Sequence, residues 1–188
     1  MSRNNLKKKK ENFLFSQGGS GTEYTLMNFD WSEGLYSRHQ RIVNFRNESD
    51  KFVYIFNNPI DILKSFERRG FLDIKSAVIN LQGDVSFKPP MDLKSISDMG
   101  IDFFHFEQHF ENFYKQNNKG LFIKFDSLDK GWNEIEKFTN LKRKSNFVWK
   151  DKNSNHSVYS DETIKKLNDI YSKWIERYNN LPEIFYNN

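Results

Sequence analysis

The chain has 188 residues, which fits one domain long enough to bury a hydrophobic core of its own. Its 19 phenylalanines and 8 tyrosines favour a folded core, and its 29% charged residues indicate a polar surface. The absence of cysteine excludes disulfides, thiolate zinc sites and cysteine nucleophiles, and it suits a reducing compartment. No apolar stretch is long enough to be a membrane span or a signal peptide, so we expect a cytoplasmic protein with no membrane partner.

The net charge of +4 comes from 29 basic and 25 acidic residues, and part of the excess lies in the lysine run at residues 7–10. A short lysine run near a terminus is more often a solvated tail than a nucleic-acid arm. No arginine-rich helix or aromatic RNA-reading motif supports the second interpretation. We therefore expect a basic, flexible tail at residues 1–11, a single domain at residues 12–188, and no nucleic-acid partner.

The first predicted strand, NFLF at residues 12–15, runs into SQGGSGTEYTLMNF, a glycine-rich turn followed by a predicted helix. Strand, glycine loop and helix in this order can cradle a phosphate. No Lys-Ser or Lys-Thr pair follows Gly18, Gly19 and Gly21, so the loop lacks the ordinary nucleotide-triphosphatase signature. ATP or GTP hydrolysis is thus disfavoured, and a turn that only reverses the chain is the alternative.

The next segment, KFVYIFNNPIDILKSFERRGF, has unusually well-marked boundaries. Residues 52–56 form an apolar run rich in β-formers, which predicts a strand buried on both faces. A helix follows at once, because Asn58 can cap it, Pro59 suits its first position and Gly70 ends it. Such a junction can bind an anion at the carboxyl edge of a parallel sheet, although most junctions of this kind in α/β proteins are empty.

Two further strands are predicted at residues 40–45 and 121–125. The second is followed by a helix in which Trp132, Ile135 and Phe138 recur at helical spacing. Strands therefore alternate with helices. This alternation predicts an α/β fold with a mainly parallel sheet, in which the strands near 12–16, 52–56 and 121–125 lie centrally.

Between these strands lies an aromatic segment, SDMGIDFFHFEQHFENFYKQ. Its helical spacing predicts a core stripe formed by Phe103, Phe106, Phe110 and Phe113 on one helix. His105 and His109, four residues apart, could share a metal ion. No third ligand is evident and the glutamate has the wrong spacing for a zinc protease, so we expect ordinary surface histidines and no metal.

The last predicted element is a terminal helix. Ser160 is its expected cap, and its apolar face is expected to comprise Ile164, Leu167, Tyr171, Trp174 and Tyr178. The segment from residue 141 to 160 is polar and basic and has no clear periodicity. We expect it to be a long loop, and long loops in compact domains often carry function.

Several segments, taken in order, resemble the sulfotransferases that use 3′-phosphoadenosine-5′-phosphosulfate (PAPS). GGSGTEYT lies where that family has its Lys-Ser-Gly-Thr-Thr loop for the 5′-phosphosulfate, and SRHQ lies where it has its catalytic histidine. VYIFNNPIDILKSF resembles the strand and helix that hold the 3′-phosphate. HFENFY, LFIKFDSL and WNEIEKFTNL resemble the family's aromatic helix, its late strand and the helix after that strand. The resemblance implies a P-loop NTPase-like sulfotransferase fold, a three-layer α/β sandwich with a mainly parallel sheet.

The same resemblance implies roles for individual residues. His39 would be the catalytic base, with Arg38 and Arg41 as auxiliary positive charges. The residues implied in PAPS binding are Gly18, Gly19, Ser20, Gly21, Thr22, Glu23, Tyr24, Asn57, Ser65, Arg143 and Lys144. The reaction would be in-line transfer of a sulfuryl group from PAPS, as co-substrate, to a hydroxyl or amine of a small molecule or glycan, without a metal.

Two positions depart from the family pattern. Asn57 stands where the family has an arginine, and Gly19 stands where it has the loop lysine that stabilises the leaving phosphate. Both changes remove positive charge from positions that face phosphate. They favour a second hypothesis, a degenerate nucleotide- or partner-binding protein that keeps the fold without the transfer chemistry. A kinase-like phosphoryl transferase is a third hypothesis, which the missing lysine and magnesium ligands disfavour.

Overall fold

The structure is a computed structural model. It describes residues 12–29, 31, 41, 45, 47–72, 88, 90, 92–144 and 159–187. The predicted tail at residues 1–11 lies outside these residues, as does most of the predicted strand at 40–45. The predicted long loop is described only for residues 141–144 and 159–160, which are neither helix nor strand.

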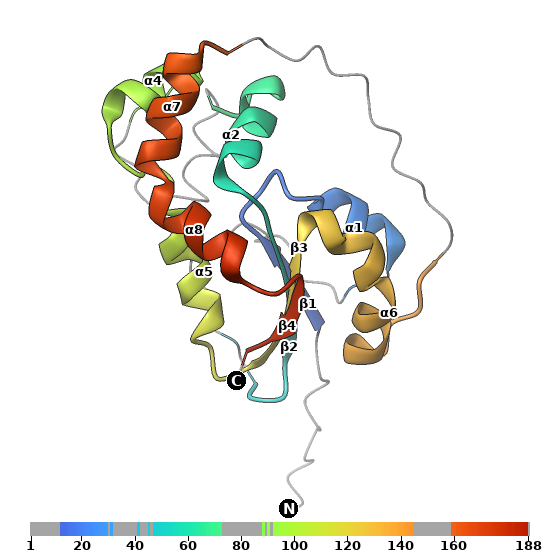
Figure 1. The fold of residues 1–188 in the computed structure, drawn as a ribbon. Helices are drawn as coiled ribbons and strands as arrows, with labels where there is room; N and C mark the ends of the chain where they lie inside the picture. The colour runs from blue at the N-terminus through green and yellow to red at the C-terminus, as the bar shows by residue number, and fades with distance from the viewer. Residues whose placement is uncertain are drawn as a thin grey trace, which may run out of the picture.

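Four strands form one sheet in this part of the chain, in the spatial order β1-β2-β3-β4 (Figure 1). They are β1 (Asn12–Ser16), β2 (Lys51–Phe56), β3 (Lys119–Lys124) and β4 (Ile184–Tyr186). The first three strands run parallel to one another, and β4 runs antiparallel to β3. The predicted α/β fold with a mainly parallel sheet is therefore confirmed.

The places of the strands in the sheet differ from the prediction at both edges. Strands β2 and β3 are central as expected, but β1 lies at an edge of the described sheet, so the central position predicted for it is wrong. Strand β4 was not predicted, because three residues are too few to show the alternation of a strand. It pairs with the outer edge of β3.

Helices cover both faces of the sheet, which gives three layers (Figure 1). One face packs against α1 (Thr22–Asn28) and α6 (Leu128–Thr139), which follows the short 3-10 turn η1 (Phe125–Ser127). The other face packs against α2 (Pro59–Arg68), α5 (Phe106–Tyr114) and α8 (Ser172–Asn180). Helices α4 (Leu93–Met99) and α7 (Asp161–Ile170) lie side by side beyond α2.

Strand β2 shows how the sequence builds these layers. Successive side chains of a strand point to opposite faces. Phe52, Tyr54 and Phe56 accordingly belong to the phenylalanine-rich core beneath α2, α5 and α8, whereas Val53 and Ile55 belong to the core beneath α1 and α6. All five side chains are fully buried, as predicted for a strand covered on both faces.

The predicted aromatic stripe is buried, but one helix does not carry all of it. Phe103, Phe106, Phe110 and Phe113 are each at most 1% exposed. Helix α4 ends at Met99, just before Gly100, and α5 begins just after His105. Gly100 and His105 both have a positive φ, which interrupts a right-handed helix. Phe103 therefore packs from the connection between the two helices.

The terminal helix also divides in two. The hydroxyl of Ser160 accepts a hydrogen bond from the backbone N–H of Thr163 at 3.2 Å, which confirms the predicted cap. Helix α7 ends at Ile170, and α8 begins at Ser172. The residues of the predicted apolar face are buried, except that Ile164 is partly buried.

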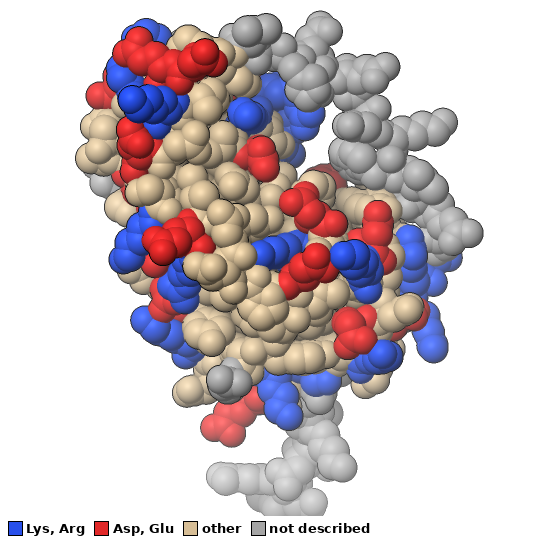
Figure 2. Space-filling model, viewed as in Figure 1, with Lys and Arg blue, Asp and Glu red and all other residues tan. Residues whose placement is uncertain are grey.

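No helix among the described residues has the length and apolar character needed to cross a bilayer. On the face shown in Figure 2, acidic and basic side chains are interspersed among larger areas of uncharged residues. Basic side chains also gather over the far end of α2, where the sequence supplies Lys64, Arg68 and Arg69.

Candidate functional site

The glycine loop joins β1 to α1 at the carboxyl edge of the sheet. Gly18, Gly19 and Gly21 all have φ values between 60° and 78°, a left-handed conformation that only glycine adopts without strain. A Cβ on Gly21 would lie 2.5 Å from the Phe125 ring, and one on Gly19 would lie 3.4 Å from backbone atoms of Ile62. The loop is therefore held between the chain that follows β2 and the chain that follows β3.

Hydroxyl groups brace this loop from within. The Ser16 and Thr22 hydroxyls are 2.5 Å apart, and the Ser16 hydroxyl also accepts from the backbone N–H of Gly18 at 3.1 Å. The Ser20 hydroxyl donates to the carbonyl of Ile55 at 3.4 Å. These three hydroxyl side chains are at most 5% exposed, so Ser20 and Thr22, predicted to bind the phosphosulfate, brace the loop with their side chains. Ligand binding at this loop would depend on backbone N–H groups.

Gln17 connects the loop to the core below it. Its side-chain nitrogen donates to the carbonyl of Phe106 at 2.8 Å and lies within hydrogen-bonding reach of the Tyr54 hydroxyl. The Tyr54 hydroxyl is 2.6 Å from Nδ1 of His109. Burial raises the pKa of Tyr54 well above its usual value, and the bond from Gln17 only partly opposes this shift. The hydroxyl therefore stays protonated, and it shares a hydrogen bond with Nδ1 of His109.

This arrangement corrects one expectation for the histidines. His109 is 1% exposed and is bonded to Tyr54, so it is not a surface residue. His105 is exposed, as expected, at the start of α5. Within the described ranges, no group of three or more His, Asp and Glu side chains could hold a metal ion.

The junction of β2 and α2 lies beside the loop. The side chain of Asn58 accepts from the backbone N–H of Ile60 at 2.9 Å, which confirms the predicted cap. Asn57 is 4% exposed, and its side-chain oxygen accepts from the backbone N–H of Asn58 at 2.8 Å and from the Tyr178 hydroxyl at 3.5 Å. The side chain of Asn57 is thus used within the protein.

The remaining residues predicted to bind PAPS lie in different places. Glu23 is exposed on the first turn of α1, and Tyr24 packs edge-on against Trp132 of α6. Ser65 is partly exposed on the polar face of α2, one helical turn after the exposed Asp61.

Arg143 and Lys144 lie with the other layer. Arg143 donates from Nε to the side chain of Asn28 at 3.1 Å and lies over the Trp132 ring at 4.9 Å. The backbone N–H of Lys144 donates to the carbonyl of Asn28 at 2.8 Å. Because α1 runs away from the carboxyl edge, Asn28 at its end lies far down that layer. The structure does not bring these two basic residues to Ser65.

The histidine segment is described only in part. Arg38 and the predicted base His39 lie outside the described residues. The carbonyl of Arg41 accepts from the side chain of Asn112 at 2.9 Å, which places Arg41 against α5. Nothing in the described part of the chain tests the role of this segment.

Charged groups around the carboxyl edge include Asp61, Lys124 and Asp126. Burial raises the pKa of Asp61, an effect that Lys64 opposes and Asp126 increases. Burial also lowers the pKa of Lys124, whose ammonium lies 4.7 Å from the Tyr178 ring. Asp61 and Asp126 lie within the segments that resemble the sulfotransferase family, whereas Lys124 was given no role there. The edge between β2 and β3 thus carries negative charge beside the glycine loop.

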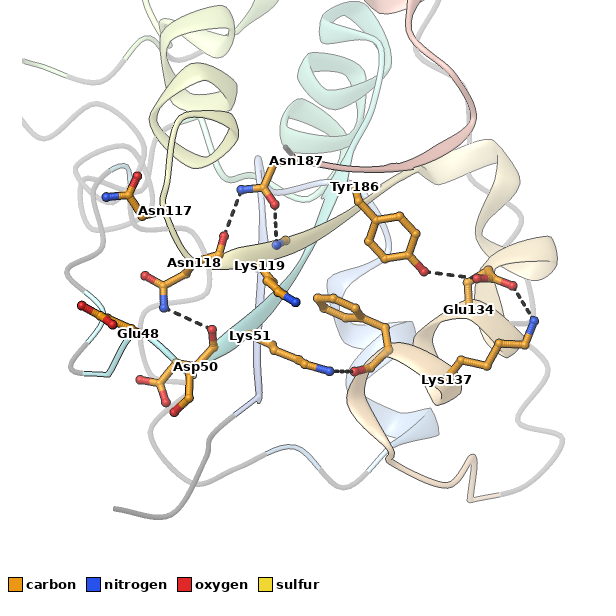
Figure 3. Close-up of a pocket in the computed structure, with 13 residues that line it drawn as sticks. Glu48, Asp50, Lys51, Asn117, Asn118, Lys119, Glu134, Lys137, Tyr186 and Asn187 are labelled. Carbon is orange, nitrogen blue, oxygen red and sulfur yellow. Dashed lines mark hydrogen bonds and ion pairs between the residues drawn. The ribbon is translucent and has the colours of Figure 1, made fainter. Parts of the chain in front are cut away.

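A hollow of about 760 Å³ lies at the opposite, amino edge of the sheet (Figure 3). It is lined by the first residues of β2 and β3, the end of α6 and the end of β4, and by none of the predicted site residues. Many of its polar groups bond to one another. Glu134 binds both Lys137 and the Tyr186 hydroxyl, and Lys51 donates to the carbonyl of Phe138.

Comparison of the chain with protein-family models, with curated proteins and with solved structures finds no match. The function is therefore argued from the residues and their geometry.

Proposed function

We propose that the chain is a PAPS-dependent sulfotransferase with a P-loop-like fold. It would bind PAPS at the carboxyl edge of β1 and β2 and transfer the sulfuryl group to a hydroxyl or amine, with a carbohydrate as one acceptor class. A cytoplasmic location belongs to the same proposal. The observation that carries it is the close approach of Gly19 to Ile62, where an added Cβ would lie 3.4 Å from Ile62, because this approach sets the glycine loop beside the first turn of α2.

Two features at this edge favour an anionic ligand. Strands β1 and β2 are adjacent and parallel, so the loop after one and the helix after the other begin side by side. The start of α2 carries the positive end of a ten-residue helix dipole. Open α/β sheets bind ligands in the crevice outside the carboxyl ends of their strands. A phosphosulfate group has the charge and size that this arrangement favours.

The transfer chemistry in this proposal needs a base and a stabilised leaving group. His39 has an ordinary pKa range suited to removing the acceptor proton at neutral pH. Gly19 has no side chain to place a cation on the leaving phosphate. Backbone N–H groups of the loop would therefore stabilise the developing charge, as they do in oxyanion holes.

One observation favours a second candidate, a nucleotide- or partner-binding protein without transfer chemistry. Gly19 has a φ of 60° and its Cβ position is close to Ile62, so the lysine of the family pattern would be strained there. Asn57 is buried and bonded within the protein. The loop lysine and the arginine of the family pattern are thus both absent, and neither the strained backbone at position 19 nor the buried site at position 57 suits such a side chain.

A ligand-binding measurement tests the nucleotide site. The melting temperature is recorded with 3′-phosphoadenosine-5′-phosphate (PAP), AMP and ATP over a range of concentrations. A ligand at about 100 times its dissociation constant stabilises the folded state by about 2.7 kcal/mol. We expect PAP to stabilise more than AMP or ATP. Equal responses, or none, would remove the PAPS site.

A transfer assay then separates the two candidates. Sulfate transfer from PAPS to a panel of sugars and phenols is compared for the parent and for His39→Ala. Loss of a general base costs about two to four powers of ten in turnover, with nucleotide affinity nearly unchanged. Binding of PAP without any transfer by the parent would favour the binding protein.

A further inference from the structure

We propose that Arg69, at the end of α2, is the guanidinium that binds a phosphate group of the ligand. This inference rests on the proposed function, and it names the residue that supplies the positive charge missing at position 57. The ligand class is a phosphate monoester, which the proposed function identifies as the 3′-phosphate of PAPS.

The guanidinium of Arg69 is held in a fixed orientation. Its Nε donates to the carbonyl of Ser65 at 3.1 Å, one helical turn earlier. The group lies 4.5 Å from the centre of the Phe71 ring and 6.0 Å from that of Phe66. A planar guanidinium fixed by one hydrogen bond and by aromatic rings loses less conformational entropy when it binds a ligand.

None of the described residues binds the two terminal nitrogens of Arg69. Arg69 forms an ion pair with none of the carboxylates in the described part of the chain, and its only side-chain hydrogen bond there is the one from Nε. The neighbouring carboxylate, Glu67, is turned away and accepts from the backbone N–H of Leu93 at 2.9 Å. Two parallel N–H donors therefore remain, and this fork matches two oxygens of a phosphate.

Positive charge accumulates around Arg69, and the nearest opposing charge within the described residues, that of Glu23, forms no ion pair with it. Arg68 is exposed beside it, and Lys64 lies on the preceding turn. Burial and the charge of Arg68 lower the pKa of Arg69, and Glu23 only partly opposes these effects. The last turn of a helix accounts for one basic residue, because cations there interact favourably with the dipole. It does not account for an oriented, unpaired guanidinium beside a second arginine.

The position of Arg69 connects it to the candidate site. Glu23, whose charge acts on Arg69, is on the first turn of α1, directly after the glycine loop. Ser65, whose carbonyl orients Arg69, is on the polar face of α2. Arg69 therefore lies on the face of α2 that carries Ser65 and within electrostatic range of the first turn of α1. Arg143 cannot take this part, because it is bonded to Asn28 on the opposite layer.

Calorimetric titration tests the assignment with three probes: PAP, AMP and inorganic pyrophosphate. The variants are Arg69→Gln, Arg69→Lys, and Lys142→Gln as a control that removes one exposed positive charge elsewhere. We expect Arg69→Gln to weaken PAP binding about 10- to 100-fold, the loss typical of hydrogen bonds to a charged group. AMP, which lacks the 3′-phosphate, should bind the variant as it binds the parent. Arg69→Lys should restore only part of the loss, because lysine cannot form the fork.

The outcomes separate this inference from the function on which it rests. PAP binding that is the same in the parent and in Arg69→Gln overturns the assignment of Arg69 while the PAPS site stands. Arg69-dependent binding of pyrophosphate without any preference for PAP over AMP supports the phosphate assignment and overturns the PAPS site. A loss equally large in Lys142→Gln reduces the effect to overall charge and overturns the assignment. No binding of any probe by the parent overturns both. Arg69→Lys keeps the aliphatic stem over Phe71, so it controls for lost packing.

Discussion

The two edges of the sheet are built from different residues. At the carboxyl edge, glycines with positive φ and buried hydroxyls shape a tight loop against the start of α2. At the amino edge, asparagine side chains hold the backbone by hydrogen bonds to its carbonyls. Asn118 donates to the carbonyls of Asn47 and Asp50, and Asn187 donates to those of Gln116 and Asn118.

The difference lies in which polar groups remain available. At the amino edge, side-chain amides satisfy backbone groups that would otherwise face the hollow, and the Asn187 oxygen accepts from Gly120 at 2.6 Å (Figure 3). At the carboxyl edge, α1 and α2 begin, and Asn58 caps the backbone N–H of Ile60 in α2. The hollow at the amino edge is roomy, but the starts of these two helices lie at the carboxyl edge. Space alone therefore does not locate the site.

The largest effect is expected at Gly21. A Cβ there would lie 2.5 and 2.8 Å from atoms of the Phe125 ring, and the residue has a φ of 73°. Gly21→Ala should cost about 3 kcal/mol of unfolding free energy, from backbone strain together with displacement of the ring. Urea unfolding measures the loss.

Gly100→Ala is the matched control for this variant. Gly100 has a φ of 66° and no atom within 4 Å of its Cβ position, so only backbone strain of about 1 kcal/mol is expected. Equal losses in the two variants would show that the contact with Phe125 does not hold the loop.

The next effect concerns Tyr54, which supports the carboxyl edge from below. Tyr54→Phe removes the buried hydrogen bond between the Tyr54 hydroxyl and Nδ1 of His109, which costs about 2 kcal/mol. The variant should also change the response to alkali. The folded-state pKa of Tyr54 lies above the usual 10.0. The protonated Tyr54 side chain therefore contributes fully to the unfolding free energy below pH 10, and this contribution is lost as pH rises toward the folded-state pKa.

The test compares the unfolding free energy of the parent with that of Tyr54→Phe between pH 8 and pH 11. The parent should lose stability above about pH 10, the usual tyrosine pKa, more steeply than Tyr54→Phe. Tyr171, whose pKa is also raised by burial, is present in both proteins and sets the shared background. Parallel curves would mean that Tyr54 ionises in the folded state as readily as in the unfolded state.

A smaller effect is expected at the amino edge. Asn187→Ala removes three hydrogen bonds near the end of the chain, and partial exposure limits the cost to about 1.5 kcal/mol. Nucleotide affinity should not change. Asn117→Ala, at an exposed side chain with no hydrogen bond among the described residues, should change neither quantity. Weaker PAP binding in Asn187→Ala would contradict the assignment of the two edges.

The sequence was most informative where structure is set by neighbouring residues. Asn58, Pro59 and Gly70 mark the ends of α2 because capping, a fixed φ and a left-handed end are local properties. The strands β1, β2 and β3 were predicted for the same reason. The aromatic segment misled only where Gly100 and His105 break the helix.

Contacts between distant segments could not be predicted in this way. Gln17, Tyr54 and His109 meet from three elements, and no local pattern links their positions. Arg143 was expected near Ser65, but its place depends on how the chain returns past α1 after α6. Arg69 could have been noticed from its spacing, since it lies four residues after Ser65 on one helix face.

The smallest effect is expected at the helix caps. It compares the start of α2, which is assigned to the ligand site, with the start of α7, which only stabilises its helix. Asn58→Ala removes the hydrogen bond to Ile60 and should cost about 1 kcal/mol of unfolding free energy. Ser160→Ala removes the corresponding cap of α7 and should cost about the same, also about 1 kcal/mol. Only the first variant should weaken PAP binding, because Asn58 fixes the turn of α2 that contacts Gly19, whereas α7 packs against α4. Urea unfolding and calorimetric titration of both variants give the two quantities. If the variants lose stability equally and bind PAP equally well, the start of α2 caps a helix and does not contribute to the site.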